Sequence, residues 1–438
     1  LLDQPTLHDK IEFEIVFSCY TLDLPDKLKN LPKVNFSYND QKSIALSLRH
    51  LTNKIIDNDN GIWKNDVKKI EILNERRNIL LNSPSDLIER VYWLLEDTKR
   101  YGTLPFAGLA RAGFIAVQML HSLVSIGVFS SKDYESFMAS LTTVTGQLSK
   151  DKLKLDKETF ISKYGHLRPG TYDILSPRYD EAKDLYFDWD LNHKDLENSE
   201  QEKFSLSLSQ IKEITNLLKS HNLSTDPVGL LNFLQTAIEM REMSKFEFTR
   251  NLSDALSLLA RIAEDYGISR EDISYADIRA FKELHITAVD PKDLLMHTIE
   301  EGKKRYEETL KISLPPLIAS PKDVWGFEWP NSEPNFITQK KITAHVFKYN
   351  SINDIDINKL EGSIICIPSA DPGFDWLFSY KIKGLITAWG GVNSHMSIRA
   401  GEIGLPSVIG AGELLYKRWA NARRLHLDCC GRKVVVLE

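Results

Sequence analysis

Apolar residues recur at three- and four-residue spacing over much of the chain between about residues 40 and 310. The segments QKSIALSLRHLTNKII, SPSDLIERVYWLLEDTKRY and DALSLLARIAEDYG show this spacing, which predicts helices that pack through one apolar face. Ser83 and Ser85 are the candidate N-caps in the second segment. A more continuously apolar stretch from 105 to 129 is interrupted by Arg111 and His121, so we expect a buried helix rather than a membrane span.

A different pattern stands near the start of the chain, where KIEFEIVF alternates apolar and acidic residues. The alternation predicts a strand with Glu12 and Glu14 on one face. The simpler interpretation is a half-buried strand with a solvated acidic edge, and the alternative is a pair of carboxylates near a metal-bound nucleotide. Residues 189–203 are polar with little periodicity and predict an exposed loop.

Prolines change the character of the chain from about residue 313. The stretch SLPPLIASPKDVWGFEWPNSEPNF holds five of them, which excludes regular helix and favours an extended connector. KITAHVF, SIICIPS, GLITAW, PSVIG, RLHLDCC and KVVVLE then predict short strands, with helices at DPGFDWLFSYK, SHMSIRAGEIG and GELLYKRWA. We therefore predict an α+β protein, with a mostly helical domain over 1–312, a swivel linker over 313–340 and a small α/β domain over 341–438.

Composition places the chain among soluble globular proteins, with 42% hydrophobic and 26% charged residues. The formal net charge of −6 gives no reason to expect nucleic acid or an anionic membrane as a partner. The four cysteines lack CxxC spacing, which argues against a disulfide framework or a zinc site and suits a cytoplasmic protein. No signal peptide is recognisable. Because the chain opens on Leu1 rather than Met, we also expect a fragment of a longer protein.

One C-terminal stretch, GLITAWGGVNSHMSIRAGEIGLPSVIG, holds the most chemical information. A predicted strand runs into Gly390 and Gly391, which let the backbone turn sharply and a partner approach closely. A helix follows, with Ser394 or Asn393 as its cap and His395 in its first turn. Free N–H groups and the helix dipole favour an anion there, so the local physics suits a neutral histidine that takes up a phosphoryl group. Alone, this pattern is weak, because a histidine near a helix start is more often structural.

The same stretch resembles the phosphohistidine domain of the phosphoenolpyruvate-utilising enzymes, whose pattern is roughly G-G-x-x-S-H-x-x-I-x-A-R-E-x-G-I-P-x-V-x-G. The chain matches this pattern without a gap at Gly390, Gly391, Ser394, His395, Ile398, Ala400, Glu402, Gly404, Pro406, Val408 and Gly410. The resemblance implies a swivelling domain in which His395 carries the phosphoryl group. At the family's arginine position stands Gly401, and an arginine lies two residues earlier as Arg399. Arg399 either reaches the phosphate from another angle or is a solvated helix residue.

Three polar clusters mark the predicted helical domain. Arg111 lies within an otherwise apolar segment, where a charge needs a partner or a ligand. The loop YGHLRPGTYDILSPRYDE has the composition of a binding loop set on a helical scaffold. It concentrates His166, Arg168, Tyr172, Asp173 and Arg178. Further on, Arg241, Lys245 and Thr249 share one helical face. The simpler interpretations are a structural loop for the second cluster and a solvated, ion-paired helix surface for the third.

These clusters resemble segments of the glutamine kinase type within the same family, most clearly at YGTLPFA, GHLRPGTYDI and KFEFTRNLS. The resemblance implies an enzyme that splits ATP to AMP and phosphate, loads His395, and phosphorylates the amide of L-glutamine for modification of a capsular polysaccharide. The cations would hold the phosphoryl group and the acceptor carboxylate, and His166 or Asp173 would act as base. Two alternatives stay open: a rifampin phosphotransferase-like enzyme with a hydroxyl acceptor, and a non-enzymatic phosphocarrier.

The position of the motif in the chain sets further expectations. Because 28 residues follow Gly410, we expect no phosphoenolpyruvate-binding barrel. The sequence shows no Gly-rich nucleotide loop and no ATP-grasp pattern. We therefore expect ATP and Mg2+ to be bound mainly by an ATP-grasp domain of the same polypeptide, upstream of Leu1. The expected partners are that domain and a small-molecule acceptor, with no membrane and no nucleic acid. We predict no metal ligands beyond the weak candidates Glu12 and Glu14.

Overall fold

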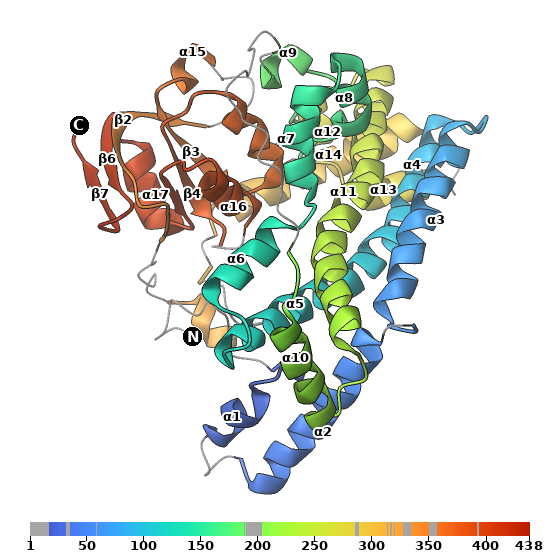
Figure 1. Cartoon of the computed structure of the whole chain (residues 1–438). Helices are drawn as coiled ribbons and strands as arrows, with labels where there is room; N and C mark the ends of the chain where they lie inside the picture. Colours follow the sequence, from blue (N-terminus) through green and yellow to red (C-terminus); the bar gives the residue numbers. More distant parts are fainter. Residues whose placement is uncertain are drawn as a thin grey trace.

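The computed structural model describes residues 17–31, 36–57, 59–187, 189, 204–284, 289–312, 314–315, 318, 320–326, 334–349, 357–391 and 394–438. Helices make up the part before residue 312, here called the helical region, and a mixed sheet with short helices makes up the sheet region after residue 334 (Figure 1). This composition agrees with the predicted α+β class. The predicted strand with Glu12 and Glu14, most of the predicted loop over 189–203, and Asn393 lie outside the described residues.

The helical region is built around the long helix α11, which α3, α4 and α5 contact along its length (Figure 1). Its helices are α1 (Leu24–Lys29), α2 (Tyr38–Ile56), α3 (Trp63–Leu81), α4 (Leu87–Asp97), the π-helix η3 (Thr98–Thr103), α5 (Leu104–Ser125), α6 (Ser131–Ala139), α7 (Val144–Lys154), α8 (Lys157–Tyr164), α9 (Lys183–Tyr186), α10 (Leu208–Ser220), α11 (Pro227–Asp265), α12 (Arg270–Ile273), α13 (Ile278–Leu284) and α14 (Pro291–Thr309).

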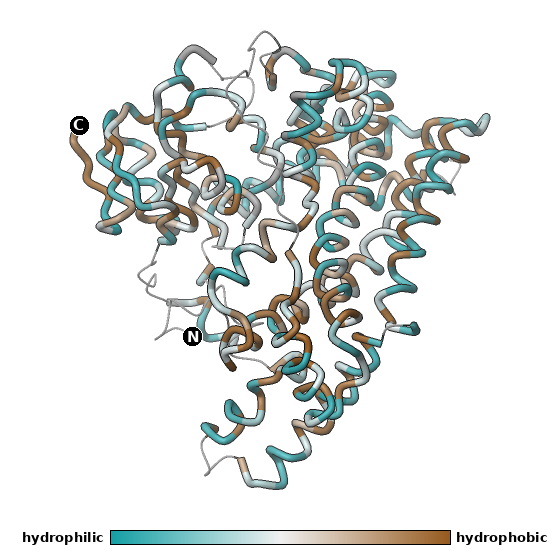
Figure 2. Tube along the Cα trace, viewed as in Figure 1, coloured by the Kyte–Doolittle hydropathy of each residue, from teal (hydrophilic) through white to brown (hydrophobic). Residues whose placement is uncertain are grey.

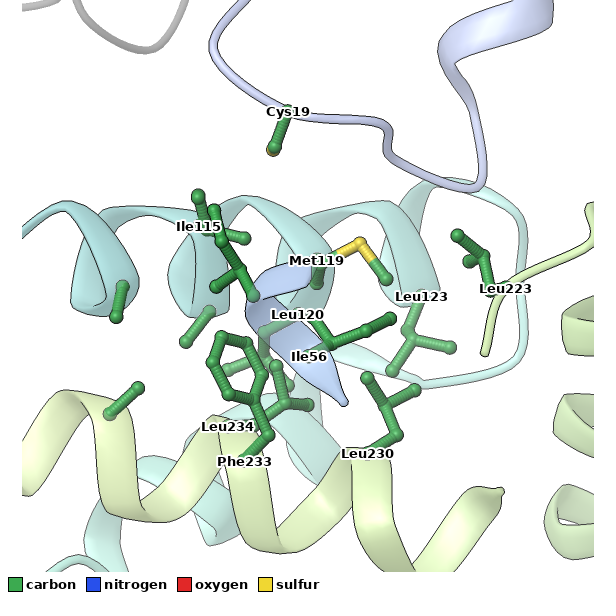
Figure 3. Packing of buried hydrophobic residues seen from close by; sticks show 14 of the residues in the cluster. Cys19, Ile56, Ile115, Met119, Leu120, Leu123, Leu223, Leu230, Phe233 and Leu234 are labelled. Atoms are coloured by element: carbon green, nitrogen blue, oxygen red, sulfur yellow. The ribbon is translucent and has the colours of Figure 1, made fainter. Parts of the chain in front are cut away.

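Apolar side chains from α2, α5 and α11 form the core of the lower half of this region. Figure 3 shows Ile115 and Met119 of α5 facing Leu230 and Phe233 of α11, with Ile56 of α2 between them. Figure 2 shows the hydrophobic positions gathering where these helices meet. Each side chain of this size contributes about 1.5–3 kcal/mol when fully buried. The three- and four-residue spacing of apolar residues in the sequence therefore reflects the packing of these helices in this core.

The helix continues without a break from Leu87 to Ser125. By length and composition it could cross a membrane, and 44% of its most apolar window is buried inside the protein. A core helix passes the same test, and α5 packs on α11 as such a helix, as predicted. Asp86, rather than Ser83 or Ser85, caps its start by accepting a hydrogen bond from the Glu89 N–H at 2.8 Å. The prediction was wrong because the helix begins at Leu87, which puts Asp86 at the N-cap position and leaves Ser83 and Ser85 outside it.

The sheet region contains a seven-stranded sheet with the order β1-β5-β4-β3-β2-β6-β7. Strands β2 to β5 run parallel, whereas β1, β6 and β7 pair antiparallel with their neighbours. Its elements are β1 (Asn335–Ile337), β2 (Lys341–Lys348), α15 (Ile357–Leu360), β3 (Ile364–Ser369), the 3-10 helix η6 (Pro372–Ser379), β4 (Gly384–Trp389), α16 (His395–Glu402), β5 (Ser407–Ile409), α17 (Gly412–Ala420), β6 (Arg424–Asp428) and β7 (Lys433–Val436). Every strand and helix predicted after residue 340 is confirmed.

The predicted linker over 313–340 is not extended throughout. Its described part contains the single-turn 3-10 helix η4 (Pro321–Val324) and strand β1, which pairs antiparallel with β5. A three-residue strand shows no periodicity, so only its pairing with β5 identifies it. The sheet thus begins at Asn335, a few residues before the predicted boundary. The domain boundaries and the swivel function of the linker stay predictions.

The helical and sheet regions share an aromatic core. Trp376 of η6 packs with Tyr186 of α9, at 5.5 Å between ring centroids, and belongs to the same buried cluster as Phe160 of α8. The Tyr380 hydroxyl donates to the Leu185 carbonyl at 2.9 Å. Figure 1 shows the sheet region beside α7, α8 and α9. The sheet region is therefore docked on the helical region through η6.

Candidate functional site

The turn before the predicted carrier histidine requires glycine. At Gly390, directly after β4, φ is +131°, a backbone region that side chains rarely allow. A Cβ there would lie 2.5 Å from the Ala370 Cβ, so the space is closed as well. The Gly391 carbonyl then accepts a hydrogen bond from the Ser394 N–H at 3.0 Å. These contacts set the chain direction into the next helix.

Helix α16 begins at His395, as predicted. Ser394 occupies the N-cap position with extended backbone, but its side chain makes no capping hydrogen bond. Its Oγ is buried and has no hydrogen-bond partner among the described residues. The predicted capping bond is therefore absent, and a buried hydroxyl lies at a helix N-terminus, where unpaired N–H groups and the helix dipole favour anions.

This helix start lies at the carboxyl ends of the parallel strands β3 and β4, where α/β sheets bind their ligands. The Ala370 N–H after β3 bonds the Trp389 carbonyl at the end of β4, at 2.9 Å. Close by in sequence, Gly373 is packed against the helical region. A Cβ on Gly373 would come within 2.1 Å of the Arg168 carbonyl oxygen. The edge of the sheet at which α16 begins thus contacts the loop that holds Arg168.

Arg399 is not a solvated residue. Its side chain is 15% exposed, and its Nε lies 3.7 Å from Oδ1 of the buried Asp375 on η6. The guanidinium also lies 5.9 Å from the centre of the Phe378 ring. One of the two interpretations left open by the sequence is thereby excluded.

Arg168 ties its loop to α11. Arg168 is 2% exposed, and its guanidinium donates to the carbonyls of Asp173, Ser176 and Ser253 at 3.2 Å. It also donates to the hydroxyls of Ser253 and Ser257 at 3.3 and 3.1 Å. Burial lowers the pKa of Arg168 to about 10. With its donors engaged by these oxygens, Arg168 holds the loop in place and is not available to an acceptor carboxylate.

Arg178 is held by two carboxylates. It forms a fork with Asp180 at 2.9 and 2.6 Å and donates to Asp254 of α11 at 2.6 Å. Asp254 also accepts from Arg77 of α3 at 2.9 and 2.6 Å. Arg77 and Asp254 were not among the predicted site residues, and no local pattern marks them, because these partners lie up to 177 residues apart. These ion pairs join α3, α11 and the loop that holds Arg178.

The remaining polar residues of the loop fall into two groups. Asp173 is exposed and closes a turn by accepting from the Leu175 N–H at 2.9 Å and the Ser176 hydroxyl at 2.7 Å. Tyr172 is exposed. His166 is 5% exposed, stacks edge-on against Phe246 at 4.7 Å, and has an Nε2 without a hydrogen-bond partner among the described residues. Burial and the positive charges of neighbouring arginines hold the pKa of His166 well below its usual value.

The predicted cations on α5 and α11 differ in burial. Arg111 lies on the exposed face of α5, so its charge is solvated and needs no buried partner. Arg241 is largely buried, with its guanidinium 5.0 Å from the centre of the Phe114 ring and its Nε without a hydrogen-bond partner among the described residues. Burial lowers the pKa of Arg241. Lys245 follows one turn later and is half-buried, so the two cations face the same side of α11.

Within the described ranges, no group of three or more His, Cys, Asp or Glu side chains could hold a metal ion. The described cysteines are all free thiols. Glu12 and Glu14 lie outside these ranges, so nothing tests them.

Comparison with known proteins defines the class of the C-terminal part. Residues 359–430 match the family model described as "PEP-utilising enzyme, mobile domain". This match covers β3 to β6, including the Gly390 turn and His395. It supports the phosphoenolpyruvate-utilising family for this chain, as the resemblance of the motif implied.

Two curated relatives extend the similarity. The chain is 26% identical over 296 residues to the rifampicin phosphotransferase of Bacillus cereus, which covers 63% of this chain and 33% of that protein. It is 25% identical over 271 residues to the rifampicin phosphotransferase of Bacillus subtilis, with 57% and 31% covered. The chain thus spans about a third of the length of these relatives. Both of these relatives are phosphotransferases by name, whereas nothing in the comparisons supports the predicted glutamine acceptor.

Proposed function

We propose that this chain carries and delivers phosphoryl groups within an ATP-dependent phosphotransferase, with His395 as the carrier. The observation behind the proposal is the position of this histidine within the matched mobile domain. It begins a helix directly after a glycine turn, at the carboxyl edge of parallel strands. A neutral imidazole at a helix N-terminus can act as a nucleophile, and the resulting phosphoryl anion is favoured by the same N–H groups and dipole.

The proposed acceptor is a hydroxyl group of a rifamycin-type compound. Rifampicin phosphotransferases match more residues than the sheet region contains, so the similarity extends into the helical region, where the acceptor would bind. The alternative acceptor, L-glutamine, needs a cation for its carboxylate. Two of the five predicted cations, Arg168 and Arg178, are engaged by loop oxygens and by aspartates and are therefore less suited to that role. This favours the hydroxyl acceptor.

Phosphoryl transfer would proceed by cleavage of the P–N bond of phosphohistidine and formation of a P–O bond to the acceptor. The hydroxyl proton passes to a base, and the imidazole returns to its neutral form. Overall, ATP, water and the alcohol give AMP, phosphate and the phosphorylated alcohol. Catalysis of this kind depends on positioning and on cations that bind the transferring group. Arg241 and Lys245 would supply that charge, because they lie just before Phe246, which belongs to the core shared with the sheet region.

The nucleotide would be bound elsewhere. We assign ATP and Mg2+ to an ATP-grasp domain outside this chain, as the resemblance to the phosphoenolpyruvate-utilising enzymes implies. That domain and the small-molecule acceptor are the proposed partners, and the cytoplasm is the proposed location.

The test uses the full-length protein with magnesium, ATP and either rifampicin or L-glutamine. We expect AMP, phosphate and a phosphorylated rifampicin detected by mass spectrometry, all lost in His395→Asn. Arg418→Ala, an exposed substitution in the same region, serves as the matched control and should keep the activity. A phosphorylated glutamine would instead establish the alternative acceptor. If ATP is consumed equally by the wild-type protein and His395→Asn, the carrier assignment is wrong.

A further inference from the structure

Two polar side chains from different parts of the helical region border the ring of Phe246. The imidazole of His166, on the loop after α8, lies edge-on at 4.7 Å between ring centroids. The guanidinium of Arg250, on α11, lies 5.3 Å from the centre of the same ring. Among the charges that act on His166, that of Arg250 has the largest effect. His166 and Arg250 are therefore close neighbours in space.

Each of these two side chains keeps a buried nitrogen that has no hydrogen-bond partner among the described residues. In His166, which is 5% exposed, this atom is Nε2, and in Arg250 it is Nε. Another edge of the Arg250 guanidinium is anchored, because its Nη2 donates to the Lys163 carbonyl at 3.1 Å. Buried polar atoms in this state are costly, so the pair is suited to a ligand group that supplies what both atoms lack.

The two nitrogens require opposite hydrogen-bonding partners. Burial and neighbouring positive charges hold the pKa of His166 well below its usual value, so the imidazole is neutral and can accept a hydrogen bond, whereas a guanidinium N–H only donates. A group between them must donate to His166 and accept from Arg250. A hydroxyl group does both.

The charged groups around His166 come from three elements. They are Arg250 and Asp254 on α11, Arg178 and Asp180 on the loop, and Arg77 on α3. Tyr164 of α8, which also packs on Phe246, is an uncharged phenol that donates to Asp151 at 2.8 Å. Asp254 and Asp180 offset the charges of Arg178 and Arg77, so Arg250 opposes protonation of His166 most strongly.

This pair lies where the sheet region docks. Phe246 belongs to the buried cluster that also contains Met396 and Ala400 of α16, and Leu167 packs against the same cluster. An acceptor bound at the pair would therefore lie near the carrier helix, in a place shielded from water while the sheet region is docked. Exclusion of water strengthens the electrostatic interactions of such a site.

We propose that His166 and Arg250 bind the acceptor hydroxyl together, with Nε2 of His166 accepting its proton and Arg250 donating to its oxygen. This inference rests on the proposed function and names the base in it. The P–N bond of the phosphohistidine breaks and returns its electron pair to the carrier imidazole while the new P–O bond forms. The hydroxyl proton moves to Nε2 and leaves to solvent when the sheet region separates.

The chemistry of phosphoryl transfer suits a weak base that is always unprotonated. Because the transition state is loose, the base mainly orients the nucleophile and takes its proton late, so the low pKa of His166 is no obstacle. Asp173, the other predicted base, already accepts from the Leu175 N–H and the Ser176 hydroxyl.

The experiment isolates the full-length protein after phosphorylation by ATP and measures single-turnover transfer to the acceptor at several pH values. The acceptor is rifampicin, or L-glutamine if the wild-type protein uses it instead, because an amide also donates and accepts. The variants are His166→Gln, Arg250→Gln and Arg250→Lys. His297→Gln on α14 and Arg261→Ala on α11, both at exposed positions, are the matched controls.

We expect His166→Gln and Arg250→Gln each to slow transfer about 100-fold while loading by ATP stays normal. Arg250→Lys, which keeps the positive charge, should recover part of the rate, and the controls should transfer normally. Wild-type transfer should fall only well below pH 6.5, the usual pKa of histidine. Arg250→Gln should move this fall to higher pH, because the charge that most opposes protonation of His166 is gone.

Three outcomes overturn the proposal. Transfer at the wild-type rate in His166→Gln or Arg250→Gln removes that residue from the reaction. A fall at the same pH in the wild-type protein and Arg250→Gln shows that the two residues do not act on one proton. Equal losses of loading and transfer, with a lower unfolding temperature, assign both residues to the fold.

The loading step keeps the two proposals distinguishable. If ATP fails to phosphorylate the wild-type protein, the proposed function is wrong and the inference falls with it. Normal loading combined with normal transfer in the variants rejects the inference alone.

Discussion

Two sets of arginines in the helical region differ in what their guanidinium groups contact. Arg168 and Arg178, on the loop after α8, bind carbonyls, hydroxyls and aspartates that join the loop to α11 and α3. Arg241, on α11, packs over an aromatic ring and keeps a buried Nε without a hydrogen-bond partner among the described residues. Residues of one type thus have a structural role in one place and are suited to chemistry in the other.

The largest expected effect comes from breaking the structural set. Asp254→Ala removes the carboxylate between Arg77 and Arg178 and leaves two mostly buried charges without it. Breaking such a pair from one side costs about 3–5 kcal/mol. Urea denaturation should show this loss in the free energy of unfolding. Asp277→Ala, which removes a pair with the largely exposed Arg279, should change it by less than about 1 kcal/mol. Equal losses of unfolding free energy in the two variants would contradict the structural role of the ion pairs around Asp254.

A smaller effect, seen in catalysis rather than stability, should follow from changing the other set. Arg241→Ala should lower phosphoryl transfer to the acceptor about 100-fold, the loss typical of one charge that stabilises the transition state. Loading of His395 should stay normal, because the substitution lies outside the sheet region. Single-turnover transfer from phosphorylated protein measures this step. Arg261→Ala, at an exposed position of the same helix, is the matched control. If both variants transfer at the wild-type rate, Arg241 has no part in the reaction.

The smallest effect concerns His166, on the same loop as Arg168 and Arg178. Its pKa is held below the usual value by burial first and by Arg250, Arg178 and Arg77 next. The His166 imidazole therefore takes up a proton near pH 6.5 in the unfolded chain, whereas in the folded protein it stays neutral at that pH. Stability attributable to this group should fall as the pH drops below about 6.5, by up to about 1.4 kcal/mol per unit.

Denaturation at pH 7, 6 and 5 tests this effect. His166→Gln should flatten the dependence relative to the wild-type protein, whereas the exposed control His297→Gln should keep it. A His166→Gln profile that runs parallel to the wild-type profile would show that His166 is protonated normally in the folded protein.

The sequence predicted the elements of this protein better than the roles of its charges. Alternation and short apolar runs identified the strands after residue 340, and the glycine turn with the helix start at His395 is confirmed in the backbone. Local patterns report such features because they depend on neighbours in the chain. Strand β1 was missed because three residues carry no period, and its identity comes from pairing with β5.

The arginines show where sequence reasoning stopped. A loop rich in His, Arg, Tyr and Asp looks the same whether its charges bind a ligand or one another. In this protein the charges bind other protein groups, because Arg178 meets Asp254, which is 76 residues away in sequence, and Arg168 meets the serines of α11. Likewise, Asp375 settled whether Arg399 is solvated. Such partners are set by tertiary packing, which neither spacing nor periodicity encodes.

The shared aromatic core around Trp376 and Tyr186 also bears on turnover. In the proposed function the sheet region leaves and rejoins the helices, and because both belong to one chain, this docking would be an intramolecular equilibrium with an effective concentration on the order of millimolar. An interface with a dissociation constant near that value would be occupied about half of the time, independent of how much protein is present. The contact can therefore be weak enough to separate quickly after each delivery and still be found again without a search through solution.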